Sequence, residues 1–91
     1  MLPIRWSAYA LDRFDDLMQA IAGINPRAAE ALADRIEASV LPLSDHPYLF
    51  RQGRVSGTRE VVAHPNYIVV YGVLSDCIEV TNVPHARQPY P

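Results

Sequence analysis

Residues 57–83, with the sequence GTREVVAHPNYIVVYGVLSDCIEVTNV, decide how this chain folds. Three runs rich in β-branched residues lie within this stretch, and the short turn sequences HPN and LSDC separate them. The runs cover residues 59–63, 67–73 and 78–83. Connections this short join antiparallel strands, because a parallel crossover needs about a dozen residues or more. The stretch therefore predicts a three-stranded antiparallel meander with residues 67–73 as its central strand.

Alternation along the central strand assigns its side chains to two faces of the sheet. Ile68 and Val70 point to one face, while Tyr67, Val69 and Tyr71 point to the other. Both sets are largely apolar, so we expect both faces to be at least partly covered.

The two flanking runs are more polar than the central one. In residues 59–63, Arg59 shares a face with Val61 and Ala63, so its guanidinium extends from rigid sheet rather than from a loop. Residues 78–83 alternate between apolar and polar side chains. This half-polar pattern predicts a strand near an edge of the sheet.

The first half of the chain has the pattern of one short strand and two helices. Residues 3–6 are apolar enough for a first edge strand, and Ser7 can cap the helix that follows. In residues 8–21 apolar side chains recur at three- and four-residue spacing, which predicts an amphipathic helix. Asn25 and Pro26 then open a second helix. Because the link between the helices is so short, we expect an antiparallel hairpin that covers the sheet.

Two segments are predicted to lack regular structure. Residues 41–57, LPLSDHPYLFRQGRVSG, contain two prolines and several turn-forming residues, which is typical of a loop from helix to sheet. Residues 84–91 contain three further prolines. We expect this tail to extend away from the last strand.

Length, composition and charge narrow the class of protein. A chain of 91 residues is expected to form one domain over residues 1–91. No apolar run approaches the ~20 residues of a membrane span, and the N-terminus turns acidic early, so we expect a cytoplasmic protein. The formal charge is −2 and the pI about 5.8, which argues against a general nucleic-acid binder.

The cysteine and histidine content points to neither a disulfide nor a metal site. Cys77 is the only cysteine, and its position favours a small buried apolar side chain. His46, His64 and His85 have no ligand spacing and no acidic cluster beside them. The sequence therefore predicts neither a metal ion nor a cofactor.

One combination of elements and motifs is that of a known family. A strand, a helical hairpin and a proline-rich loop precede G-x-R-E-x-x-x-H-P-N-Y-I-V-x-Y, and V-x-H-A-R-Q-x-x-P ends the chain. This pattern resembles the RelE/ParE superfamily of toxins from bacterial type II toxin–antitoxin systems, the ParE branch in particular. The resemblance spans essentially the whole chain and implies a single α+β toxin domain, in which the helical hairpin packs on a twisted antiparallel sheet.

The resemblance also implies a partner and a choice between activities. A cognate antitoxin is expected to wrap its C-terminal segment across apolar grooves of the toxin. ParE-like members inhibit DNA gyrase by protein–protein contact, whereas RelE-like members cut messenger RNA at the ribosome. We expect gyrase inhibition. The alternatives are a ribosome-dependent mRNA endonuclease and a degenerate module that only binds antitoxin.

The resemblance carries a set of catalytic residues under the endonuclease alternative. Arg59 stands where RNA-cleaving members keep a phosphate-binding arginine, and His85 with Tyr90 stands near their general acid or base. Arg87 would add a second cation. Against this alternative, Gly72 occupies the position after the central-strand tyrosine where relatives commonly have arginine, and the loop before the sheet contains no lysine. These departures favour a protein that is not an enzyme.

Structural roles for the same residues remain open. Arg59 can instead pair with Glu79 across the sheet, and His85 can serve only to anchor the tail. Tyr67 and Tyr71 can stack on bases, but packing against the core or a partner is the more common use of sheet aromatics. The predicted antitoxin-binding set consists of apolar residues from both helices and the central strand: Leu11, Phe14, Met18, Ile36, Tyr67 and Tyr71.

Overall fold

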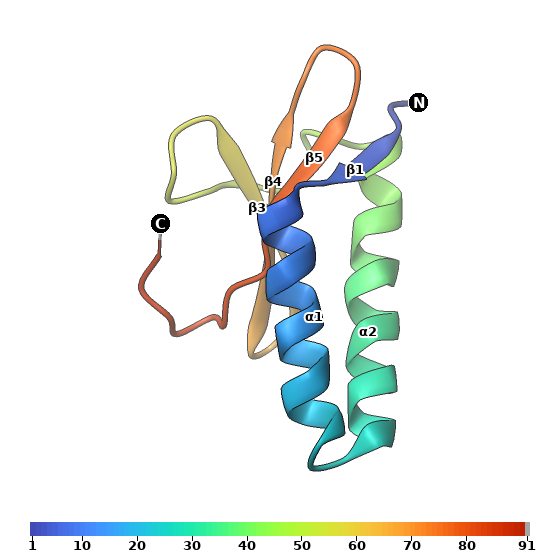
Figure 1. Ribbon diagram of the computed structural model, residues 1–91. Coiled ribbons are helices and arrows are strands. Elements are labelled where there is room, and N and C mark those ends of the chain that lie inside the picture. Colours follow the sequence, from blue (N-terminus) through green and yellow to red (C-terminus); the bar gives the residue numbers. More distant parts are fainter. Residues whose placement is uncertain (91) are drawn as a thin grey trace.

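The computed structural model describes residues 1–90 and confirms an α+β fold (Figure 1). A helical hairpin packs against one face of a five-stranded sheet whose strand order is β1-β5-β4-β3-β2. Strand β1 is parallel to β5, and all other neighbours are antiparallel. The elements in chain order are β1 (Ile4–Trp6), α1 (Ala8–Ala22), α2 (Pro26–Val40), the 3-10 helix η1 (Leu41–Ser44), β2 (Arg51–Gln52), β3 (Thr58–His64), β4 (Tyr67–Val73) and β5 (Ile78–Asn82).

Local signals start both helices where the sequence predicts them. The side chain of Ser7 accepts a hydrogen bond from the backbone N–H of Ala10 at 3.1 Å and caps α1. Asn25 caps α2 in the same way through the N–H of Ala28 at 3.1 Å, and Pro26 occupies the first turn. The two helices lie side by side and antiparallel, as predicted (Figure 1).

The predicted faces of the sheet are confirmed. Val69 and Tyr71 of β4 are fully buried in the main core beneath the helices, together with Ile36 of α2. On the opposite face, Ile68 and Val70 form a second, smaller cluster. Both faces of the central strand are thus covered, which explains why its sequence is almost continuously apolar.

Strand β5 lies near an edge of the sheet, as predicted, but it is not the edge strand itself. It lies between β1 and β4, because β1 returns alongside it in parallel register, with Ile4 opposite Ile78. The polar residue Glu79 that suggested an edge is paired with Arg5 of β1 at 3.1 Å. The helical hairpin makes this crossover possible, and no local pattern in residues 78–83 reports it.

The segment predicted as a loop contains two short elements. Pro42 lies inside η1, and Arg51 and Gln52 form β2, an edge strand paired with Glu60 and Arg59 of β3. A strand of two exposed polar residues has no hydrophobic alternation, so sequence patterning cannot detect it.

The C-terminal tail also differs from the prediction, because it turns back over the sheet instead of extending away. The N–H of Ile68 donates to the carbonyl of Pro84 at 3.1 Å, and the N–H of Ala86 donates to that of Asn66 at 2.7 Å. Tyr90 then packs on Ile68, within the cluster on the face opposite the helices. Within residues 1–90, no helix is long and apolar enough to cross a membrane.

Candidate functional site

Three of the four candidate catalytic side chains line three different hollows of the surface, and the fourth, Arg87, lines none of these three. Arg59 lines a pocket of about 330 Å³ beside β2 and β3. His85 lines a pocket of about 310 Å³ at the start of the tail. Tyr90 lines a pocket of about 280 Å³ on the sheet face opposite the helices. Cleavage of RNA requires a base, an acid and cations around one phosphate. The structure does not bring these groups together.

His85 and Tyr90 both pack against other parts of the chain. The Nδ1 atom of His85 accepts a hydrogen bond from the backbone N–H of Arg87 at 3.1 Å, and its ring packs edge-on against Tyr67 with centroids 5.3 Å apart. Tyr90 is 8% exposed, and its hydroxyl has no hydrogen-bond partner within residues 1–90. These contacts tie His85 to Tyr67 of β4 and to the backbone of the tail.

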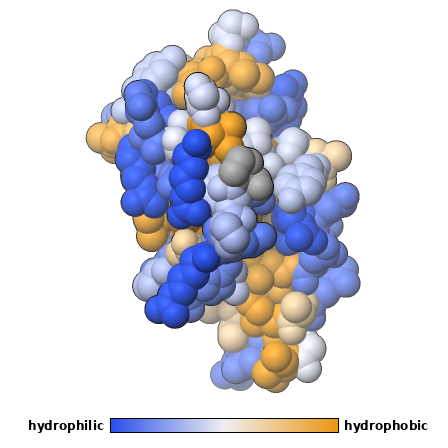
Figure 2. Space-filling model, turned by 90° about the vertical axis from the view of Figure 1, so that its left-hand side faces the viewer, coloured by the Kyte–Doolittle hydropathy of each residue, from blue (hydrophilic) through white to orange (hydrophobic). Residues whose placement is uncertain are grey.

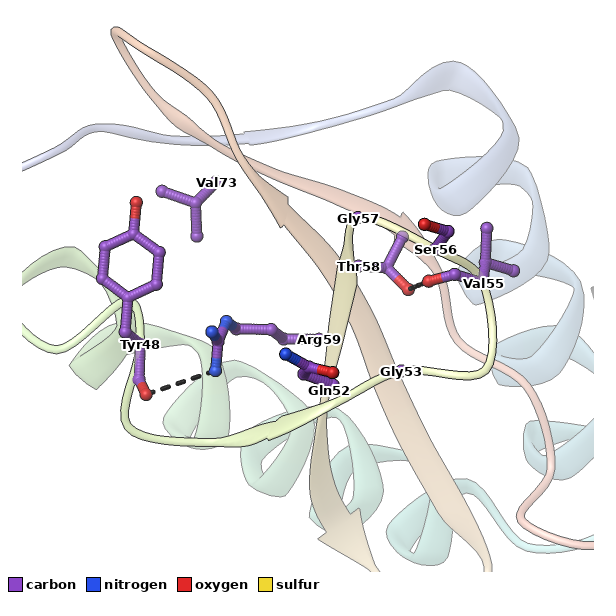
Figure 3. Close-up of a pocket in the computed structure, with 9 residues that line it drawn as sticks. All are labelled: Tyr48, Gln52, Gly53, Val55, Ser56, Gly57, Thr58, Arg59 and Val73. Carbon is purple, nitrogen blue, oxygen red and sulfur yellow. Dashed lines mark hydrogen bonds between the residues drawn. The ribbon is translucent and has the colours of Figure 1, made fainter.

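Arg59 is held by the loop before β2 rather than by Glu79. Its Nη1 donates to the backbone carbonyl of Phe50 at 2.7 Å and to that of Tyr48 at 3.3 Å. The guanidinium also lies 5.1 Å from the centroid of the Tyr48 ring, a distance typical of a cation–π contact. Figure 3 shows this side chain extending across the pocket toward Tyr48.

Glu60 is a buried carboxylate that the sequence analysis did not single out. It is 3% exposed and pairs with Arg51 at 3.0 Å and with Arg54 at 3.8 Å. The backbone N–H of Arg54 also donates to Glu60 at 3.2 Å. The sequence signal was the arginine pair in RQGR close before R-E, but the pairing requires the β2–β3 turn to be known.

Arg54 connects this buried pair to the C-terminal tail. Its guanidinium donates to the carbonyls of Gln88 at 3.2 Å and Ala86 at 3.4 Å, and lies 4.5 Å from the centroid of the Tyr90 ring. The side of the molecule that bears the tail presents mainly hydrophilic surface interrupted by apolar patches (Figure 2). The contacts of Arg54 and Tyr90 show that the tail partly covers the sheet face opposite the helices.

The predicted antitoxin-binding residues divide into exposed and buried groups. Leu11 and Phe14 line an apolar groove of about 450 Å³ between β1 and the helices. Met18 is half-buried, and Tyr67 lines the His85 pocket. Ile36 and Tyr71 are fully buried in the core, so neither reaches the surface.

Other residues complete the groove. Trp6 lies on β1, edge-on to Phe14 with ring centroids 5.4 Å apart, and Val40 and Leu41 close the far wall. Leu41 is 70% exposed and presents apolar surface at this groove. The sequence feature that marks this groove is Trp6, which directly precedes Ser7, the N-cap of α1.

Burial shifts the pKa values of two ionisable side chains, Tyr71 and Cys77. Burial raises the pKa of Tyr71 above its usual value, an effect that the nearby Arg59 partly offsets, and the Tyr71 hydroxyl donates to the carbonyl of Pro47 at 2.8 Å. Burial likewise raises the pKa of the Cys77 thiol, which disfavours the nucleophilic thiolate. Within residues 1–90, no cluster of three or more His, Cys, Asp or Glu side chains is arranged to hold a metal ion.

Comparisons with known proteins agree with this architecture. The family model described as the ParE toxin of the type II toxin–antitoxin system parDE matches residues 4–90. The Sinorhizobium fredii protein "Putative toxin Y4kP" is 38% identical over 89 residues, which cover 97% of this chain and 92% of that protein.

Solved structures share the fold at low sequence identity. A structure of the chromosomal ParDE TA system from P. aeruginosa matches with a TM-score of 0.81 and 19% identity, over 93% of this chain and 96% of that one. The E. coli DinJ-YafQ toxin–antitoxin complex matches with a TM-score of 0.63 and 13% identity, over 92% of this chain and 91% of that one. The family-model match over residues 4–90 and the 38% identical relative show that this chain belongs to the ParE toxin family of type II toxin–antitoxin systems.

Proposed function

We propose that this protein is a toxin that inhibits DNA gyrase by protein–protein contact and is neutralised by a cognate antitoxin. The observation that carries the proposal is the separation of Arg59, His85 and Tyr90 into three pockets. An endonuclease needs such groups around a single phosphodiester, whereas an inhibitor that acts by contact does not. Membership of the ParE toxin family supports gyrase as the target.

A supercoiling assay with purified gyrase tests this function. The purified protein should inhibit supercoiling of relaxed plasmid in proportion to its concentration, and prior mixing with the antitoxin should relieve the inhibition. Primer extension on cellular RNA after expression serves as the second arm. Codon-phased cuts without any effect on gyrase would instead establish the endonuclease alternative. Growth unaffected by expression, with both assays negative, would leave only an antitoxin-binding module.

The groove beside β1 is the proposed antitoxin-binding surface. The carbonyl of Pro3 and the N–H of Ser7 bond to β5, so in the alternating pattern of a strand the backbone groups of Ile4 and Trp6 face away from β5. Their side chains line the apolar groove. An extended antitoxin segment can thus pair with the free edge of β1 while it places apolar side chains in the groove.

A charge placed in this groove should weaken antitoxin binding. Leu11 is 46% exposed, so Leu11→Asp is compatible with the fold, yet it would bury a carboxylate against the bound segment. We expect the antitoxin Kd to rise about tenfold or more while gyrase inhibition persists. Ile24→Asp, at a residue 90% exposed in the turn between the helices, is the matched control. Equal antitoxin affinity of the two variants, measured by calorimetry, would contradict the assignment of the groove.

A further inference from the structure

The pocket at Arg59 contains a cation whose position is fixed and whose charge no acidic side chain within residues 1–90 neutralises. Among the described residues, ion pairs form at Arg5, Arg13, Arg51 and Arg54, and none forms at Arg59. The two acceptors that hold its Nη1 are neutral backbone carbonyls, and the pocket lining contains no acidic residue. A guanidinium has five donors, so most of this one stays free to bind an anion in a bidentate manner.

The wall opposite Tyr48 is the β2–β3 turn, and it has little freedom to move. The N–H of Gly53 donates to the carbonyl of Thr58 at 2.8 Å, and the Thr58 hydroxyl donates to the carbonyl of Val55 at 2.6 Å. Gly57 has a φ of 83°, a left-handed conformation that favours glycine. A side chain at Gly53 would meet the Thr58 hydroxyl, so the two ends of the turn approach closely. The pocket is therefore largely preformed.

The neighbours of Arg59 indicate what kind of anion fits. Gln52 lies directly across the β2–β3 pair from Arg59, and both side chains border the same hollow (Figure 3). Tyr48, which lines the same pocket, is 66% exposed and offers an aromatic ring to a partner. Arginine and tyrosine around a small pocket are typical of the residues that dominate the energy of protein–protein interfaces.

Nucleic acid fits this surface less well than protein does. Binding to a phosphate backbone normally uses several free cations, and each contributes to the affinity. Here the nearest arginines in the chain, Arg51 and Arg54, are already paired with the buried Glu60. The chain as a whole has a formal charge of −2. One guanidinium without an ion pair among the described residues, with an exposed tyrosine beside it, matches a single carboxylate on a protein surface.

We infer that the Arg59 pocket receives an aspartate or glutamate carboxylate of the protein that this toxin inhibits. The pocket borders β2 and β3, whereas the antitoxin groove borders β1 at the opposite edge of the sheet. The two sites are thus separate, and target binding can be disturbed without disturbing antitoxin binding. Naming gyrase as the source of this carboxylate rests on the proposed function.

The test uses a substitution that places a carboxylate inside the pocket. Gln52→Glu keeps the shape of the side chain and places a carboxylate beside Arg59, where it competes with a partner's carboxylate. Arg59→Gln removes the cation itself. Each variant should raise the concentration for half-maximal gyrase inhibition about tenfold or more, and abolish growth arrest at matched expression. Antitoxin Kd should change less than about threefold in both, which also reports that the fold is intact.

Matched controls carry the same changes at exposed positions on the helices. Gln19→Glu and Arg35→Gln alter the net charge by the same amounts, and both should inhibit gyrase as the unchanged protein does. The inference is overturned if Gln52→Glu remains fully toxic while it binds antitoxin normally. Codon-phased RNA cuts that disappear in Gln52→Glu would also overturn it, because they would assign the pocket to RNA.

Failure of the proposed function gives a different result from failure of this inference. If the unchanged protein arrests growth without affecting gyrase, the target is wrong, and the loss of growth arrest in Gln52→Glu and Arg59→Gln still supports a carboxylate on another protein. If the unchanged protein inhibits gyrase and both variants inhibit it equally well, the target is right and the pocket is not the contact.

Discussion

Replacing Ile36 by alanine should lower the free energy of unfolding by about 2–5 kcal/mol. Ile36 is fully buried on the face of α2 that packs against the sheet, so truncation removes apolar contacts and leaves a cavity. A domain of this size has a total stability of only about 5–14 kcal/mol. The variant should therefore unfold at a much lower urea concentration and accumulate poorly in cells.

Ile24→Ala is the control for this prediction. It deletes the same atoms from a side chain that is 90% exposed in the turn between the helices, so its effect should stay within about 0.5 kcal/mol. Urea unfolding followed by circular dichroism measures both variants. Equal stabilities would mean that α2 does not bury Ile36 against the sheet, and the assigned core would be wrong.

Replacing Glu60 by alanine should cost about 2–3 kcal/mol of stability and loosen the tail. A buried carboxylate that accepts several hydrogen bonds from charged and backbone donors is costly to delete. Removal of one partner of a buried ion pair costs about 3–5 kcal/mol when the other charge stays buried. For Glu60→Ala we expect the smaller cost of about 2–3 kcal/mol, because the side chains of Arg51 and Arg54 are 58% and 42% exposed and can turn to water.

The effect of Glu60→Ala should reach the C-terminus through Arg54. This side chain holds the carbonyls of Ala86 and Gln88, so its release should speed hydrogen exchange of the amide of Gln88, which donates to the carbonyl of His85. Glu30→Ala, at an exposed position on α2, removes the same charge without either effect. A tail that stays equally protected in Glu60→Ala would falsify the proposed connection.

The sequence predicted the structure best where the interacting residues are close together in the chain. The faces of β3 and β4 were predicted from alternation, because a side chain's face depends only on its position along the strand. The caps at Ser7 and Asn25 were predicted because their hydrogen bonds reach only three residues ahead.

The candidate site was less predictable for the same reason. Arg59 was correctly placed on rigid sheet, yet its partners are backbone carbonyls in a loop nine and eleven residues earlier. A carbonyl carries no residue identity, so no sequence pattern marks it as an acceptor. The pairing of Glu79 with Arg5 spans 74 residues and depends on the parallel return of β1.

By itself, the sequence determined the helical hairpin, the antiparallel meander and the two faces of the sheet, since each follows from periodicity and short turns. The tertiary structure alone decided that β1 joins β5, that the tail folds back over Ile68, and that Arg59, His85 and Tyr90 lie in separate pockets. The physical reason is that such contacts join residues far apart in the chain, and only the packing of the whole chain brings them together.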